Sequence, residues 1–279
     1  MHTFPAPDGT PLAYHPSGAG APLICLPGGP MRDSAYLGDL GGLADTGVRT
    51  VRLDLRGTGD SGVPADPGSY ACERQVEDVE ALRRHLGLDR IRLLGHSAGA
   101  ALAVLYTARH PEHVSSLVLV TPQVEPLGEP VRVEDRLETA RLRKGEEWFP
   151  AAYAAMEAIT GGRATEADWA AAAPLSHGRW DEAARAHRAA GPAQRHPEAA
   201  AAYAAEDIDP DTVRTALGAY RGRALLLAGE FDVASPPRPV TACASAFPDA
   251  ETAVLTGAGH FPWHDDPAGF VSAVAGFLA

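Results

Sequence analysis

The chain has 279 residues, 45% of them hydrophobic and 22% charged, which is typical of a globular protein with one large domain or a domain that carries an insertion. Its formal net charge is −12, and this excludes nucleic acid as an expected partner, because an acidic surface repels phosphates. No apolar run approaches the roughly 20 residues of a membrane helix, and the first residues lack the basic and apolar regions of a secretory signal. We therefore expect a cytoplasmic protein without a membrane partner.

The first 122 residues alternate between short apolar segments and helical patterns. Two short strands are expected around the turn at Asp8 and Gly9. Residues 70–88 show helical spacing of apolar side chains. The apolar segments cover residues 22–28, 48–57, 91–97 and 115–122. Nearly continuous apolar strands that alternate with helices predict a mostly parallel sheet flanked by helices on both faces.

The strand signal disappears between residues 123 and 218 and returns after them. This stretch is rich in alanine and helix-prone, with breaks at Gly161, Pro174 and Pro197. We expect a helical cap at 123–218, inserted between two strands of one core that comprises residues 1–122 and 219–279. An alternative interpretation is a loose alanine-rich linker.

Ser97 in "LLGHSAGAAL" follows an apolar strand and precedes a helical segment that ends before Pro111. A serine between Gly95 and Gly99 in a strand, turn and helix is typical of a nucleophile elbow, where a sharp turn leaves little room for side chains. The start of the helix also favours developing negative charge. A simple helix-capping serine is the alternative.

A serine hydroxyl needs a base, and the base needs a carboxylate that orients it. His260 in "GAGHFPW" and Asp232 in "AGEFD" follow the two last predicted strands. We therefore predict Ser97, His260 and Asp232 as catalytic residues. Glu125, just after the fourth predicted parallel strand, is the substitute for Asp232 if the acid has moved.

Together these motifs resemble the α/β-hydrolase family, and in particular its proline iminopeptidase-like branch. The segment "LPGGPMRDS" is similar to the family's oxyanion loop, although Pro27 stands where a histidine is usual and Met31 where the last glycine is usual. The resemblance implies an oxyanion hole formed by the backbone N–H groups of Gly29 and Ala98. The segment "LDLRGTGDSG" is also similar to a family motif, and its Asp54 and Arg56 are expected to be structural ions.

The resemblance implies hydrolysis of an ester, an amide or a short peptide, without a metal or organic cofactor. An aminopeptidase like the proline iminopeptidases is one possibility, and a carboxylesterase, a specialised tailoring acyl hydrolase or a carbon–carbon bond hydrolase is the alternative. A third alternative is a receptor with the hydrolase fold that binds a small molecule without cleaving it. A dinucleotide-binding protein is excluded, because "GHSAGA" lacks the required glycine spacing. His110 and His113 in "HPEH" have no third ligand nearby in sequence, so no metal site is predicted.

Candidate substrate-binding residues lie beside the nucleophile and in the expected cap. An aminopeptidase needs carboxylates that bind the substrate's ammonium group, and aromatic side chains favour an apolar acyl pocket. The candidates are His96, Glu146, Glu147, Trp148, Phe149 and Tyr153, with Glu157 as a further carboxylate. Solvated helix charges are the alternative interpretation of the glutamates.

Overall fold

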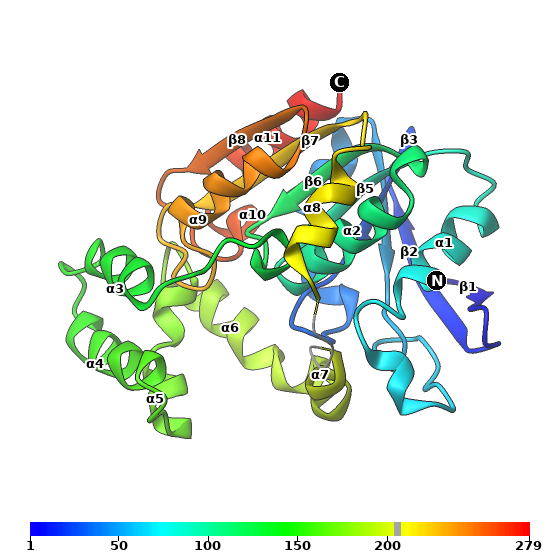
Figure 1. The fold of residues 1–279 in the computed structure, drawn as a ribbon. Coiled ribbons are helices and arrows are strands. Elements are labelled where there is room, and N and C mark those ends of the chain that lie inside the picture. Colours follow the sequence, from blue (N-terminus) through cyan, green and yellow to red (C-terminus); the bar gives the residue numbers. More distant parts are fainter. Residues whose placement is uncertain (204–207) are drawn as a thin grey trace.

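An eight-stranded sheet forms the centre of the computed structural model, which describes residues 1–203 and 208–279. The strand order is β1-β2-β4-β3-β5-β6-β7-β8 (Figure 1). Strands β1 and β2 form the expected N-terminal hairpin, and β2 pairs antiparallel with β4, whereas the strands from β4 to β8 are parallel. The strands are β1 (His2–Pro5), β2 (Pro11–Ser17), β3 (Ala21–Leu26), β4 (Val48–Leu53), β5 (Ile91–His96), β6 (Val114–Val120), β7 (Arg223–Gly229) and β8 (Ala250–Leu255). The predicted, mostly parallel sheet is confirmed.

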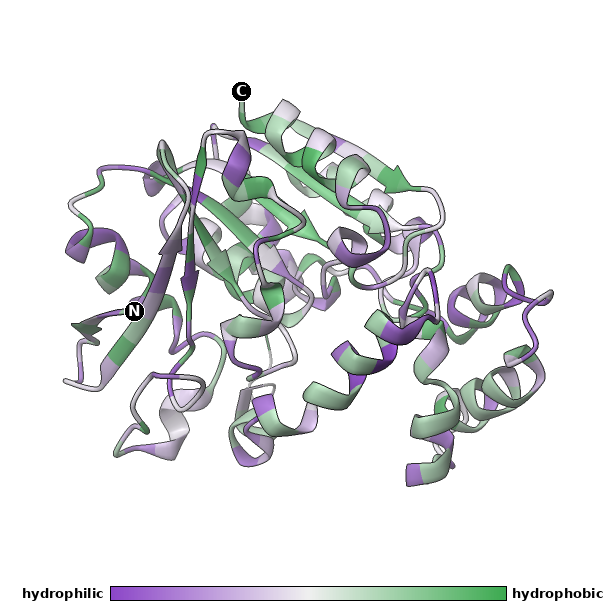
Figure 2. Ribbon diagram, turned by 180° about the vertical axis from the view of Figure 1, so that it is seen from behind, coloured by the Kyte–Doolittle hydropathy of each residue, from purple (hydrophilic) through white to green (hydrophobic). Residues whose placement is uncertain are grey.

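Helices cover both faces of the sheet, and this explains why its central strands β3, β5, β6 and β7 are apolar on both sides. In β3, Ile24 and Leu26 point into one apolar core while Leu23 and Cys25 point into the other, as the two-residue repeat of a strand requires. The first core is closed by α1 (Val76–His85), α2 (Ala98–Arg109), α8 (Pro210–Leu217) and α9 (Pro237–Ala242), and the second by α10 (Pro262–Asp265) and α11 (Pro267–Leu278). Figure 2 shows the apolar strands between these layers.

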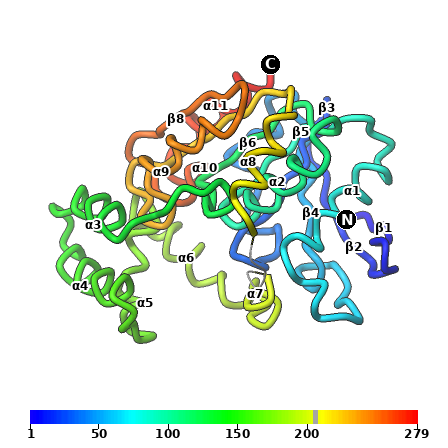
Figure 3. The backbone as a smooth tube through the Cα atoms, in the orientation of Figure 1, coloured from blue at the N-terminus to red at the C-terminus, as the bar shows by residue number. Residues whose placement is uncertain are grey.

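Among the described residues, five further helices lie between β6 and β7 in sequence, and the first three of them form an arm beyond the strand ends (Figures 1 and 3). They are α3 (Val133–Arg141), α4 (Phe149–Thr160), α5 (Glu166–Ala171), α6 (Glu182–Ala190) and α7 (Pro197–Tyr203). Helices α3, α4 and α5 share a small apolar cluster, whereas Tyr203 of α7 and Val213 of α8 join the first core of the sheet. The division of the chain at 123 and 218 stays a prediction. Among the described residues, no helix is long and apolar enough to cross a membrane.

Asp54 and Arg56 after β4 are buried, with 2% and 3% of their surface exposed. Asp54 accepts hydrogen bonds from His15 and from the Ser34 and Asp60 backbone. The Arg56 guanidinium makes two hydrogen bonds, of 2.8 and 2.5 Å, to the buried Asp78 carboxylate. Both side chains therefore act as structural ions that fix the loop after β4 to the core.

We expect Asp78→Asn to lower the free energy of unfolding by about 3 kcal/mol or more, because it leaves a buried guanidinium without its full countercharge. Asp8 also accepts from Arg56, at 2.7 Å, but its side chain is 42% exposed. Asp8→Asn is therefore the matched control, with an expected loss of about 1 kcal/mol or less. Urea unfolding of both variants checks this, and equal losses would contradict it.

Candidate active site

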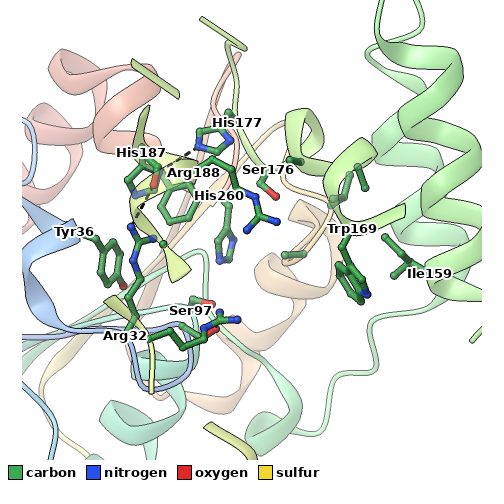
Figure 4. A pocket seen from close by; sticks show the side chains of 18 of the residues that line it. Arg32, Tyr36, Ser97, Ile159, Trp169, Ser176, His177, His187, Arg188 and His260 are labelled. Atoms are coloured by element: carbon green, nitrogen blue, oxygen red, sulfur yellow. Dashed lines mark hydrogen bonds between the residues drawn. The ribbon is translucent and has the colours of Figure 1, made fainter. Parts of the chain in front are cut away.

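Ser97 stands at the junction of β5 and α2 with φ of 53° and ψ of −120°. This left-handed backbone is strained for a residue with a side chain, and such strain is typical of a nucleophile elbow. Ser97 N–H donates to Val120 O at 3.0 Å, and Ser97 O accepts from Gln123 N at 3.0 Å, so the elbow is tied to the end of β6. Its hydroxyl faces the same cavity as His260 (Figure 4).

The glycines around Ser97 are required by close backbone contacts. A Cβ on Gly95 would lie 2.5 Å from Gly99 O, and a Cβ on Gly99 would lie 2.4 Å from Leu26 O. A Cβ on Gly28 would lie 2.9 Å from the Ser97 Cβ. The loop after β3 is therefore packed directly against the elbow, and only glycine allows this approach.

His260 and Asp232 are brought together from the loops after β8 and β7. His260 Nδ1 lies 2.8 Å from Asp232 Oδ2, and Asp232 is fully buried. The other carboxylate oxygen of Asp232 accepts from Ala234 N at 2.8 Å and from Ser235 N at 3.1 Å, which fixes the carboxylate. Glu125, the alternative acid, is exposed, and His260 Nδ1 is already bonded to Asp232.

The backbone of His260 is held on both sides. Its N–H donates to Ser176 O at 3.0 Å, and its carbonyl accepts from Thr121 Oγ1 at 3.0 Å and from His96 Nε2 at 2.9 Å. These bonds leave the imidazole free to point into the cavity.

Tyr36 is a site residue that the sequence interpretation missed. Because His96 Nε2 donates to a carbonyl, His96 Nδ1 accepts, and the Tyr36 hydroxyl donates to it at 2.6 Å. Gly28 N–H donates in turn to the Tyr36 oxygen at 2.6 Å. A chain of hydrogen bonds thus links the loop after β3 to the backbone of His260. The only signal in the sequence was an aromatic residue soon after "LPGGP".

Gly29 and Ala98 each present a backbone N–H without a hydrogen-bond partner in the described part of the chain. Ala98 is the first residue of α2, where no intrahelical acceptor exists. Gly29 lines the cavity with Ser97 and has φ of 122°. Two free donors beside the serine are the arrangement that an oxyanion requires.

A cavity of about 860 Å³ lies over Ser97 and His260. It is lined from the loop after β3, from the elbow, from α3 to α7 with their connections, and from the loops after β7 and β8. Its apolar side chains include Met156, Ile159 and Trp169, and its polar ones include Arg32, Arg188 and Arg195. The sequence interpretation did not select these arginines: Arg32 lies in the quoted "LPGGPMRDS" segment but was given no role, and Arg188 and Arg195 belong to no motif.

Of the candidate substrate-binding residues, His96 lines this cavity and the others do not. Helix α4 reaches the cavity only with its C-terminal turns, and these candidates lie before or within its N-terminal turns or, as Glu157, point to solvent. Glu146 accepts from Arg143, Trp148 lies under the same guanidinium, and the Phe149 ring lies against the Tyr153 ring at a tilt of 35°. The structure therefore corrects their expected position; these residues are Glu146, Glu147, Trp148, Phe149, Tyr153 and Glu157.

Glu80 supplies a third potential ligand beside His110 and His113, which the sequence interpretation had not found. The three ligand atoms lie within 4.8 Å of one another. The Glu80 carboxylate, however, already accepts from Arg83 at 2.8 Å and from Arg84 at 2.7 Å. These two guanidiniums repel a cation, so we assign no metal to this group.

Buried histidines surround the cavity in the neutral form. Burial lowers the pKa of His96 well below its usual range, and nearby His260 lowers it further. Burial likewise lowers the pKa of His177 to about 4. Burial, with the Arg32 charge next in effect, lowers the pKa of His187 to about 3.

We expect the protein to lose stability as the pH falls below 6.5. Between that value and the lowered values in the native state, the unfolded chain binds protons that the native histidines do not, so acid favours unfolding. At pH 5, each histidine that stays neutral lowers the free energy of unfolding by about 2 kcal/mol relative to pH 7.5. Urea unfolding at both pH values checks this. In His187→Gln, the free energy of unfolding should differ less between pH 5 and pH 7.5 than in the wild type. An unchanged difference would contradict the neutral form of His187 in the native protein.

The sequence pattern of the α/β-hydrolase fold family matches residues 21–267. The chain belongs to this family. Among curated relatives, a proline iminopeptidase from Lactobacillus helveticus (strain DPC 4571) is 43% identical over 101 residues, which are 35% of this chain and 34% of that protein. The alignment thus spans about a third of the curated relative. The predicted family and the similarity of this α/β-hydrolase to proline iminopeptidases are both confirmed.

Solved structures agree with this fold over nearly the whole hydrolase chain. A proline iminopeptidase from Mycobacterium smegmatis has a TM-score of 0.76 at 23% identity and covers 99% of this chain and 97% of its own. An esterase from Exiguobacterium antarcticum has a TM-score of 0.74 at 19% identity, and the match covers 99% of this chain and 98% of the esterase. At these identities, the likeness shows the fold and leaves the substrate open.

Proposed function

We propose that this α/β-hydrolase cleaves an ester or amide bond of a small substrate through an acyl-enzyme. Ser97 attacks the substrate carbonyl while His260 takes its proton, and Asp232 orients the imidazole and stabilises its charged form. The protonated His260 then gives its proton to the leaving group. Water attacks the acyl-enzyme in the second half of the reaction, again with His260 as the base, and releases the acid.

The observation that carries this proposal is that Ser97 and His260 line one cavity. The strained elbow presents the serine, and the imidazole above it is bonded at Nδ1 to the buried Asp232 carboxylate. That bond leaves Nε2 for the serine. The free N–H groups of Gly29 and Ala98 support an oxyanion hole at the same place.

Within the ester and amide class, the cavity favours a carboxylesterase or acyl hydrolase over an aminopeptidase. An aminopeptidase needs a carboxylate that binds the substrate's ammonium group. No aspartate or glutamate lines the cavity among the described residues, and four arginines do. A free amine is therefore unfavourable there.

The test is a panel of matched substrates: prolyl and alanyl arylamides, their N-acetylated forms, and neutral short-chain aryl esters. We expect hydrolysis of the esters and little of the free-amine arylamides. Cleavage of the free amines, with the acetylated forms resistant, would instead support the iminopeptidase alternative.

Labelling with a fluorophosphonate separates an enzyme from a hydrolase-fold receptor. We expect stoichiometric modification of Ser97, identified by mass spectrometry of the labelled peptide. Failure to label, together with no turnover across the panel, would overturn the proposed function.

A further inference from the structure

Four arginines line the cavity of a strongly acidic protein. Arg32, Arg136, Arg188 and Arg195 surround it, while none of its described lining residues is an aspartate or glutamate. The chain as a whole carries 36 acidic against 24 basic residues. The positive charge of the cavity lining is therefore opposite in sign to the net charge of the protein. A concave site with charges of one sign concentrates ligands of the opposite sign.

Arg32 is a buried cation without a carboxylate partner in the described part of the chain. Only 8% of its surface is exposed. Its guanidinium donates to the Gln194 side chain at 2.9 and 2.6 Å and stacks over the Tyr36 ring at 4.3 Å. Both partners are neutral, and the nearby Asp33 carboxylate acts on this charge without forming an ion pair. An anion bound nearby would therefore stabilise the buried cation.

Arg188 and Arg195 extend this positive charge toward the reacting atoms. Arg195 donates to Gly29 O, in the loop that faces Ser97. Arg188 makes no side-chain hydrogen bond or ion pair with the residues that the structure describes. Figure 4 shows its guanidinium turned into the cavity beside His260. Burial lowers the pKa of Arg32, and Arg195 and Arg188 lower it further, so the three charges act on one another.

The opposite end of the cavity is apolar. Met156 and Ile159 of α4 and Trp169 of α5 line it. In Figure 4, Ile159 and Trp169 lie on one side of Ser97 and His260, and Arg32 lies on the other. The reacting atoms are therefore located between Arg32 and an apolar region, with the Arg188 guanidinium beside His260.

We propose that the substrate is an amphipathic anion whose scissile bond joins an apolar group to a group that carries a carboxylate or a phosphate. Arg188 and Arg195 bind the anionic group, and the buried Arg32 charge attracts that group electrostatically. Helices α4 and α5 hold the apolar group. This inference rests on the proposed function for its reaction, whereas the anion site itself can be tested without turnover.

The first experiment measures binding of stable ligands to the wild-type protein by calorimetry: hexanoate, hexyl phosphate, hexanol and hexylammonium. We expect the better anion to bind at least about tenfold more tightly than hexanol, and hexylammonium to bind worst. The preferred anion distinguishes carboxylate from phosphate. Raising NaCl from about 0.02 to about 0.5 M should weaken anion binding, because salt screens the arginines.

Arg188→Gln should remove most of the anion preference. Arg185→Gln is the matched control, because Arg185 is on the same helix, is exposed and does not line the cavity. We expect that control to bind like the wild type. Equal affinity for hexanoate, hexyl phosphate and hexanol, or equal loss in the two variants, would overturn the inference.

The second experiment compares two pairs of esters, which distinguish the acyl side from the leaving-group side. One pair is 4-nitrophenyl hydrogen adipate and its methyl ester; the other is 4-carboxyphenyl hexanoate and its methyl ester. We expect one pair to show kcat/KM about tenfold higher for the anion, and this ratio to fall in Arg188→Gln.

The outcomes separate the two proposals. Ser97-dependent hydrolysis without an anion preference would overturn the inference and leave the proposed function standing. Anion binding through Arg188 without cleavage of any ester or arylamide would overturn the proposed function and leave the anion site standing.

Discussion

Ser97→Ala is expected to lower kcat by about 10⁴-fold to 10⁶-fold on the best ester of the panel. The variant removes the only atom that forms the acyl-enzyme, while the oxyanion donors and the cavity remain. The fold should be unchanged, because the Ser97 side chain makes no hydrogen bond with the described residues and alanine keeps the same backbone strain.

Initial rates, fluorophosphonate labelling and urea unfolding check this result. Ser245→Ala is the control, because Ser245 is exposed and does not line the cavity. It should keep wild-type rates. Activity of the Ser97 variant within tenfold of the wild type, with normal labelling, would exclude Ser97 as the nucleophile.

Asp232→Asn is expected to lower kcat by about 10³-fold to 10⁴-fold. Because Ala234 N and Ser235 N donate to Asp232 Oδ1, they would bind the amide oxygen of the asparagine and leave its NH₂ facing His260. The imidazole would then carry its proton on Nε2, where it cannot accept one from Ser97.

Glu125→Gln is the comparison, since Glu125 was the alternative acid and is exposed. We expect rates close to the wild type for this variant. If Glu125→Gln loses as much activity as Asp232→Asn or more, the assignment of the acid must be revised. Single-turnover kinetics place the loss in acylation or deacylation.

The sheet and the elbow could be predicted because their signals are local. Strands buried on both faces must be apolar at nearly every position, as in "PLICL", and the contacts of Gly95 and Gly99 allow no side chain. His260 and Asp232 were predictable for a related reason: parallel strands bring their carboxyl ends to one edge.

The cavity wall could not be predicted in the same way. The aromatic residues before and in the first turns of α4 suggested a pocket, but Phe149 and Tyr153 pack among the arm helices instead. Arg32 and Arg188 are 156 positions apart and carry no shared motif. Alanine-rich helices can pack at many angles, so composition does not show which helix end faces the serine.

The hydrogen bond from His260 N–H to Ser176 O joins the loop after β8 to the segment that covers the cavity. The chain after Ser176 is also fixed to the loop after β3, since Asp33 N–H donates to Gln194 O. Moving this part away would release the backbone of His260. Helices α4 and α5 pack on each other and on residues 173–176, the same segment that accepts the hydrogen bond from His260. The segment that covers the cavity and the loop that carries His260 are therefore joined, so displacing the one disturbs the backbone of the other.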